Sequence, residues 1–182
     1  RVSTTAGIGS SHGSTSAAGP SCSTSTPLRL PQSLGDAAQL RALFDGWALT
    51  YAQEHESWGC VAPQRMAAML KAAGFHAGSR VLDIGCGVGL SGAAMRAAGI
   101  GTTGGIVGVD LSDESLDEAF ACKAYQDTRL HNLEEPWPFA DASFDAVVAV
   151  GVTPYISDFS HLYSEMCRVA RQGALISWTS LE

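Results

Sequence analysis

Apolar residues recur at helical spacing from residue 36 onward. Leu40, Phe44, Trp47 and Tyr51 follow one another at steps of three and four residues, which places them on one face of an amphipathic helix. A second helix is predicted for residues 63–73, since a proline in its first turn and a glycine just beyond its end both suit a helix. Two helices therefore open the periodic part of the chain.

Short apolar runs then alternate with helical stretches. The runs predict five strands, at residues 80–84, 106–111, 128–133, 144–150 and 174–178. Helices are predicted between them, among others at residues 90–98 and 158–170. Because strands that alternate with crossover helices form parallel sheets, the pattern favours an α/β fold of three layers, with helices on both faces of a mostly parallel sheet.

The first 35 residues have a different composition. Fourteen of them are Ser or Thr, none is Asp or Glu, and large apolar side chains are few. Such a segment buries too little apolar surface to offset its ordering entropy, so residues 1–35 are predicted to be a disordered tail and residues 36–182 a single domain. Two interpretations stay open. The tail is either a transit peptide, which would place the protein in a mitochondrion or plastid, or a low-complexity segment of a cytoplasmic protein.

Composition and charge narrow the function classes. Eleven basic and eighteen acidic side chains give a net charge of −7, which opposes a nucleic-acid-binding surface. No apolar stretch approaches the roughly 20 residues of a membrane-spanning helix, so no membrane partner is expected. The five cysteines lie far apart, with no Cys-x-x-Cys pair. They disfavour a disulfide framework and a zinc site, and they fit a reducing compartment such as the cytoplasm.

The strongest local signal is a glycine-rich turn after the first predicted strand. Residues 81–90 read Val-Leu-Asp-Ile-Gly-Cys-Gly-Val-Gly-Leu, so three alternate glycines join a buried strand to a helix. Glycines let the backbone approach a ligand closely, and the free N–H groups at the start of the helix point toward that ligand. Asp110 ends the next strand, where a carboxylate can bind both hydroxyls of a ribose.

Two cofactor classes use this arrangement. Residues 87–92 match the Gly-x-Gly-x-x-Gly fingerprint of nicotinamide-dependent oxidoreductases, but that fingerprint starts its glycines directly after the strand. Here its first glycine would lie three residues beyond Ile84, and Asp83 lies inside the strand. An acid two residues before Gly85 suits a ligand that carries an amino-acid ammonium group. The pattern therefore favours such a ligand over NAD.

Several stretches resemble class I S-adenosylmethionine-dependent methyltransferases. Residues 83–89 are similar to motif I of that family, and residues 108–112 to the end of its second strand. Residues 135–148 and 168–175 resemble the passages into its fourth and fifth strands. The similarity is closest to the type 11 group and the Williams–Beuren-region methyltransferase-like proteins, in which a Trp-Ala-x-x-Tyr helix like residues 47–51 precedes a Rossmann-like domain.

The resemblance implies a Rossmann-like fold with S-adenosylmethionine as cofactor. Asp83 would support the ammonium group, Asp110 would hold the ribose hydroxyls, and Gly151 would lie near the sulfonium. Asn132 stands where many relatives have Asp, so a weaker hydrogen bond to the adenine is expected. With Tyr51, whose phenol suits either the site or packing, the candidate cofactor-binding residues are Tyr51, Asp83, Gly85, Cys86, Gly87, Gly89, Asp110, Leu111, Asn132, Leu133 and Gly151.

The implied reaction is methyl transfer to an unidentified acceptor, with a small molecule favoured because the chain is acidic. The alternative is a non-catalytic S-adenosylmethionine-binding module that acts through a partner. No metal site is predicted and no catalytic residue is assigned, since His131 and His161 have no visible partner in the sequence. The family's sheet has two further strands after the fifth. The chain is therefore expected to be truncated, with an open sheet edge, weak cofactor binding and little activity.

Overall fold

A six-stranded sheet forms the middle layer of the molecule. The computed structural model describes residues 2–7 and 37–181. The strands are β1 Val2–Gly7, β2 Val81–Ile84, β3 Ile106–Asp110, β4 Asp127–Leu130, β5 Phe144–Ala149 and β6 Ala170–Leu181. They lie in the order β1-β6-β5-β2-β3-β4, and all neighbours pair in parallel except β1, which is antiparallel to β6. Five parallel strands therefore confirm the predicted α/β fold.

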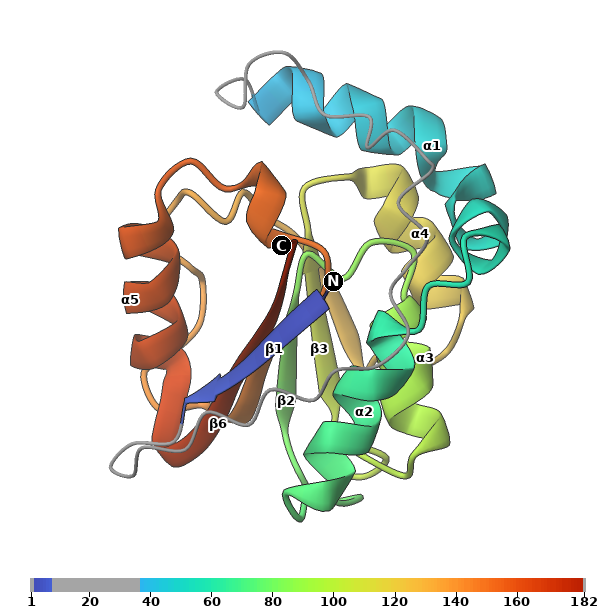
Figure 1. Ribbon diagram of the computed structural model, residues 1–182. Coiled ribbons are helices and arrows are strands. Elements are labelled where there is room, and N and C mark those ends of the chain that lie inside the picture. The colour runs from blue at the N-terminus through green and yellow to red at the C-terminus, as the bar shows by residue number, and fades with distance from the viewer. Residues whose placement is uncertain (1, 8–36, 182) are drawn as a thin grey trace.

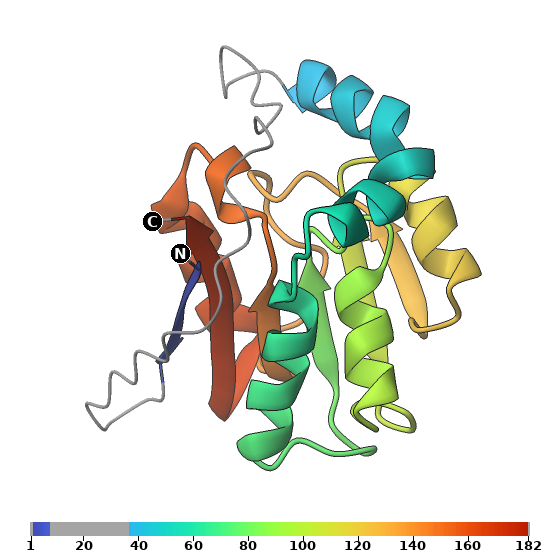
Figure 2. The ribbon, with the colours of Figure 1, turned by 45° about the vertical axis from the view of Figure 1, so that its right-hand side comes forward.

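Helices cover both faces of this sheet and one of its ends. They are α1 Ala37–Ser57, α2 Ala62–Ala72, α3 Leu90–Ala97, α4 Asp113–Ala121 and α5 Phe159–Val169, with a 3-10 turn η1 Thr153–Tyr155. Helices α2, α3 and α4 lie on one face and α5 on the other (Figures 1 and 2). Helix α1 crosses the end of the molecule at which the parallel strands finish, and it contacts α4. The three layers match the predicted arrangement, while α1 adds a cover over one end.

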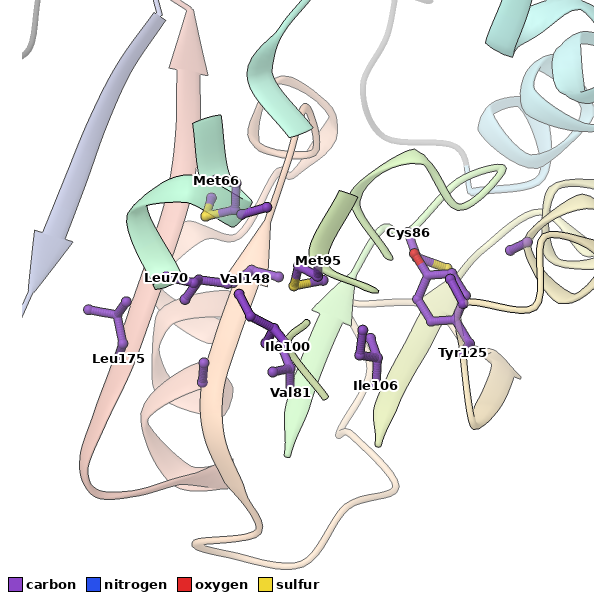
Figure 3. Close-up of a cluster of buried hydrophobic side chains, with 14 of the residues drawn as sticks. Met66, Leu70, Val81, Cys86, Met95, Ile100, Ile106, Tyr125, Val148 and Leu175 are labelled. Carbon is purple, nitrogen blue, oxygen red and sulfur yellow. The ribbon is translucent and has the colours of Figure 1, made fainter. Parts of the chain in front are cut away.

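Two apolar clusters hold the layers together. Figure 3 shows the cluster between the sheet and α2, α3 and α4, which includes Met66, Leu70, Val81, Met95, Ile100 and Ile106. The second cluster, on the α5 face, includes Leu82, Ile84, Val147, Leu162 and Met166. All residues of β2 and β3 are buried, as is usual for parallel strands with helices on both faces. The ends of these two strands are therefore fixed by the core.

Helix α4 begins with a capping residue next to the end of β3. The Ser112 hydroxyl accepts a hydrogen bond from the Ser115 N–H at 3.0 Å, and Asp113 and Glu114 occupy the first turn. A Ser cap and acids in the first turn both stabilise a helix N-terminus. This local signal fixes the direction in which the chain leaves Asp110.

Two predictions about the chain ends need correction. Residues Val2–Gly7 form β1, so the prediction of a disordered tail is wrong for this part, while residues 8–36 lie outside the described residues. The prediction of an open edge at the fifth parallel strand is also wrong, because β1 pairs with β6 from Val2↔Leu181 to Gly7↔Ile176. Backbone pairing over six positions satisfies N–H and C=O groups that an edge strand would expose.

None of the described helices is both long and apolar enough to cross a membrane.

Candidate functional site

A pocket opens where the parallel strands end, under helix α1. Its empty volume is about 930 Å³, including the part open to solvent at its mouth. The segments that follow β2, β3, β4 and β5 all contribute to its lining, together with α1. Open α/β sheets bind their ligands at this end.

The residues that line the pocket come from two sets of chain segments, which we call the cofactor half and the acceptor half. The cofactor half comes from the ends of the first three parallel strands and comprises Gly85, Gly87, Val88, Asp110, Leu111, Ser115, Asn132, Leu133 and Glu134. The acceptor half comes from α1 and the segment after β5 and comprises Ala37, Leu40, Phe44, Ala48, Tyr51, Val150, Gly151, Val152, Tyr155 and Ile156. Eight of the eleven predicted residues line the pocket, and Asp83, Cys86 and Gly89 do not.

Asp110 is the central polar group of the cofactor half. Its Oδ2 accepts a hydrogen bond from the Gly87 N–H at 2.8 Å, and its Oδ1 accepts one from the Ser112 N–H at 2.9 Å. Burial raises the pKa of this carboxyl group, and the backbone hydrogen bonds oppose that shift. A carboxylate has about four acceptor positions, so beside the backbone N–H groups Asp110 retains acceptor capacity toward the pocket that it lines.

The glycine-rich turn brings the backbone to the pocket wall. Gly85 has a φ of +62°, a left-handed conformation that favours glycine, and a Cβ built on it would overlap the Val152 side chain. Gly87 also has a positive φ, of +51°, but no atom lies within 4 Å of its Cβ position. Gly85 therefore makes room for Val152, while Gly87 leaves open space against the pocket.

Apolar and amide groups form the far side of the cofactor half. Leu133 is buried, and Leu111 lies directly after Asp110. The Asn132 side-chain oxygen accepts a hydrogen bond from the Glu134 N–H at 3.1 Å, which folds the loop after β4 back on itself. That oxygen retains one acceptor position, so the geometry is compatible with the predicted contact to an adenine amino group.

Asp83 lies beneath the glycine-rich turn and not in the pocket. It is fully buried, and its Oδ2 accepts hydrogen bonds from Ser91 Oγ at 2.5 Å and from Tyr125 Oη at 2.7 Å. The Tyr125 hydroxyl also accepts a hydrogen bond from the Gly92 N–H at 3.1 Å. Asp83 thus fastens the strand end to helix α3 through two side chains. Its other oxygen, Oδ1, is buried and has no hydrogen-bond partner among the described residues.

Cys86 and Gly89 are also placed differently from the prediction. The Cys86 side chain is buried in the cluster on the α2–α4 face, near Tyr125 (Figure 3), and burial raises the pKa of its thiol well above the usual value. Around the Cβ position of Gly89 lie Cys122 Sγ at 2.9 Å and the Ala119 Cα at 3.1 Å. Gly89 therefore permits close packing of α3 on α4, and neither residue contributes to the pocket lining.

Replacement of Asp83 by Asn is expected to change the pH dependence of stability. Burial raises the pKa of Asp83 to about 6 in the folded chain, although hydrogen bonds from Ser91 and Tyr125 lower it. The folded state then binds this proton more tightly than the unfolded state, whose pKa is near 3.8. The stability from this group is present below pH 4 and is lost as the pH rises through 6. The loss amounts to about 3 kcal/mol.

Urea unfolding of the wild type and Asp83→Asn between pH 4 and pH 7.5 measures this effect. The difference between their unfolding free energies should shift in favour of the variant by up to about 3 kcal/mol over that range. Titrating groups that do not interact with Asp83, such as Glu165, are present in both proteins and cancel in the difference. Parallel pH profiles for the two proteins would contradict the assignment.

Helix α1 is held over the pocket by polar contacts with the start of α4. The Ser112 hydroxyl donates a hydrogen bond to Asp45 Oδ1 at 2.7 Å, and Arg41 lies 3.6 Å from Asp45 and 3.7 Å from Asp113. The Ser112 hydroxyl, which accepts a hydrogen bond from the Ser115 N–H, therefore also donates one to Asp45 of α1. Through these contacts, the cover is coupled to the segment that follows Asp110.

Aromatic side chains fix the underside of α1. Trp47 is buried, and its ring centroid lies 4.9 Å from that of Tyr51 and 6.2 Å from that of Phe44. Trp47 therefore serves in packing. Tyr51 packs against Trp47 and also lines the pocket, so it has both of the roles considered for it.

Sequence reasoning missed several residues of the pocket. Phe44 was assigned only to a helix face, Glu134 and Ser115 had no assigned role, and Tyr155 was part of an unassigned loop. The available signals were Tyr155, a few residues after the fourth predicted strand, and Glu134, an acid directly after Leu133. The candidate bases His131 and His161 do not line the pocket.

The residues present fit S-adenosylmethionine. Asp110 retains acceptors for a ribose diol, Gly85 and Gly87 allow close approach of a flexible chain, and Leu111 and Leu133 offer apolar surface to an adenine. Among the described residues that line the cofactor half, no side chain is basic. This suits a cofactor that carries a sulfonium and an ammonium group.

Comparison with known families supports the same conclusion. The sequence profile of the methyltransferase domain family matches residues 82–177, more than half of the chain. The chain therefore belongs to this family of S-adenosylmethionine-dependent methyltransferases. The predicted resemblance to the type 11 group of class I enzymes is confirmed.

Individual relatives are similar over the same part. The chain is 35% identical to methyltransferase-like protein 27 of Homo sapiens over 127 residues, covering 68% of this chain and 51% of the relative. It is 29% identical to demethylmenaquinone methyltransferase of Shouchella clausii over 128 residues, again covering 68% and 51%. The chain thus spans about half the length of these two curated relatives.

A solved structure shows the same fold. Magnesium protoporphyrin IX methyltransferase from Synechocystis PCC 6803, with bound S-adenosylhomocysteine, superposes with a TM-score of 0.56 at 21% identity. The match covers 74% of this chain and 68% of that chain. The predicted Rossmann-like fold is confirmed.

Proposed function

We propose that the chain transfers the methyl group of S-adenosylmethionine to a small-molecule acceptor. The observation that carries the proposal is the continuity of the pocket. Its cofactor half centres on Asp110, and its acceptor half adjoins it under α1. A largely apolar pocket covered by a helix, beside a nucleoside site, suits a small acceptor better than an extended polymer.

The residues of the chain would act by binding and alignment. S-adenosylmethionine supplies a methyl group that is already activated on a sulfonium. Asp110 and the backbone at Gly85 and Gly87 would fix the nucleoside end, and α1 would keep water away from the acceptor. Alignment of two reactants can contribute on the order of 7–11 kcal/mol to lowering a barrier, so no catalytic triad is required.

The names of similar proteins give further support. A demethylmenaquinone methyltransferase and a magnesium protoporphyrin IX methyltransferase both carry a small molecule in their names. The net charge of −7 disfavours nucleic acid as the acceptor.

Production of S-adenosylhomocysteine tests the proposal. The chain is incubated with S-adenosylmethionine and either the low-mass fraction of a cell extract or its macromolecular fraction, and the product is measured by mass spectrometry. Product formation with the low-mass fraction, and its loss in Asp110→Ala, is expected. Product formed only with macromolecules would contradict a small-molecule acceptor. Binding of the cofactor with no product in either fraction would favour a non-catalytic binding module.

A further inference from the structure

The acceptor half of the pocket has an aromatic wall to which two distant segments contribute. Phe44 projects from α1, and Tyr155 ends the 3-10 turn η1 after β5. Their ring centroids are 5.1 Å apart with an interplanar angle of 80°, an edge-to-face contact. Tyr51 lies on the same side of α1, two turns after Phe44, and also lines the pocket. Rings held against each other in this way offer flat, rigid apolar surface to a ligand.

One carboxylate lies where the cofactor half of the pocket meets the loop that carries Tyr155 and Ile156. Glu134 lies at the solvent-exposed rim of the lining. Its Oε1 accepts hydrogen bonds from the Ser157 hydroxyl and from the Ser157 N–H, the latter at 2.7 Å. These hydrogen bonds lower the pKa of Glu134, so the group is ionised at neutral pH. The hydrogen bonds also hold the carboxylate in one place, next to the loop that carries Tyr155.

The charged side chains that line the pocket are all acidic. Its two ionisable carboxyl groups are Asp110, which is engaged with backbone N–H groups, and Glu134. Among the described residues that line the pocket, none is Lys, Arg or His. Asp158, close to Glu134, adds further negative charge. An acceptor whose carboxylate or phosphate lay beside Glu134 would be repelled by it and would find no basic partner among the described lining residues.

From these contacts we infer that the acceptor is a flat aromatic compound that carries an ammonium group. The rings of Phe44 and Tyr155 contact its aromatic body, and Glu134 attracts its positive charge. This inference rests on the proposed function, since it names the class of compound that the acceptor half takes. It disfavours acceptors whose carboxylate or phosphate would lie beside Glu134.

A pair of probes with the same ring and opposite charge tests this selectivity. Tryptamine and indole-3-propionate both place a charged group two carbons from an indole ring. Each is titrated calorimetrically into the chain saturated with S-adenosylhomocysteine. Tryptamine should bind about tenfold more tightly, because one fixed carboxylate attracts one probe and repels the other.

Substitutions at Glu134 and Tyr155 identify the side chains that cause the preference for tryptamine. Glu134→Gln keeps an oxygen that can accept from Ser157, and it should reduce the preference for tryptamine to within about threefold. The matched control, Glu135→Gln, changes an adjacent exposed acid that does not line the pocket, and the preference should persist. Tyr155→Leu should weaken tryptamine binding about fivefold without changing the sign of the preference.

The outcomes separate the inference from the proposed function. If S-adenosylhomocysteine does not bind, the proposed function fails and this inference fails with it. If S-adenosylhomocysteine binds but tryptamine binds no more tightly than indole-3-propionate, or neither probe binds, only the inference is overturned. An unchanged preference in Glu134→Gln would likewise overturn the role of Glu134.

Discussion

Replacement of Asp110 by Ala should weaken the binding of S-adenosylhomocysteine at least about 100-fold, equivalent to roughly 3 kcal/mol. The variant loses the acceptors available for the ribose hydroxyls. It also leaves the N–H groups of Gly87 and Ser112 without their partner, at 2.8 and 2.9 Å in the wild type. Unpaired donors away from water are costly, and here the buried Ser112 N–H and the partly buried Gly87 N–H belong to the two segments that shape the cofactor half. Calorimetric titration of both proteins measures the change.

The control for this experiment is Asp117→Ala. Asp117 is an exposed acid on α4 that does not line the pocket, so its removal changes the net charge equally and should leave affinity within about twofold. Circular dichroism would check that the Asp110→Ala variant is folded. A folded variant that binds as tightly as the wild type would show that Asp110 does not contact the ligand.

Replacement of Gly85 by Ala should destabilise the chain by about 3 kcal/mol and abolish measurable binding of S-adenosylhomocysteine. Gly85 has a φ of +62°, which an L-residue adopts at a cost. The new Cβ would also overlap Val152, so either the turn or the loop after β5 must move. Both segments line the pocket, and their displacement would narrow it.

Urea unfolding and calorimetry measure these two effects, with Gly46→Ala as the matched control. Gly46 lies within α1, and no atom is within 4 Å of its Cβ position. Ala there should be neutral or stabilise the chain by up to about 1 kcal/mol, because Ala is the better helix former. Equal stability of Gly85→Ala and the wild type would contradict the assigned contact with Val152.

The parts of the site that the sequence predicted are those fixed by local rules. A buried strand, three alternate glycines and a helix form one continuous segment, and Asp110 ends the adjacent strand, so Gly85, Gly87 and Asp110 could be placed in the pocket. Alternation along β2 also puts Asp83 on the same face as Val81, toward α2 and α3. The alternation of side chains along β2 therefore indicated that Asp83 lies under α3 and not in the pocket. Similarity to the family motif alone did not show this.

The parts that the sequence did not predict depend on contacts between distant segments. Phe44 and Tyr155 meet only because α1 folds over the end of the sheet, where Ser112 and Asp45 bind each other. Similarly, the role of Gly89 depends on how closely α4 approaches α3. The pairing of Val2–Gly7 with β6 joins segments at opposite ends of the chain, and no local pattern in a Ser- and Thr-rich stretch signals such a partner.

The central claim is that the pocket under α1 binds S-adenosylmethionine and not a nicotinamide dinucleotide. Calorimetric titration of the wild-type chain with S-adenosylhomocysteine, and separately with NADH, tests it most directly. Saturable binding of one S-adenosylhomocysteine per chain, without saturable binding of NADH, is the predicted result. Saturable binding of NADH by a folded chain that does not bind S-adenosylhomocysteine would contradict the account.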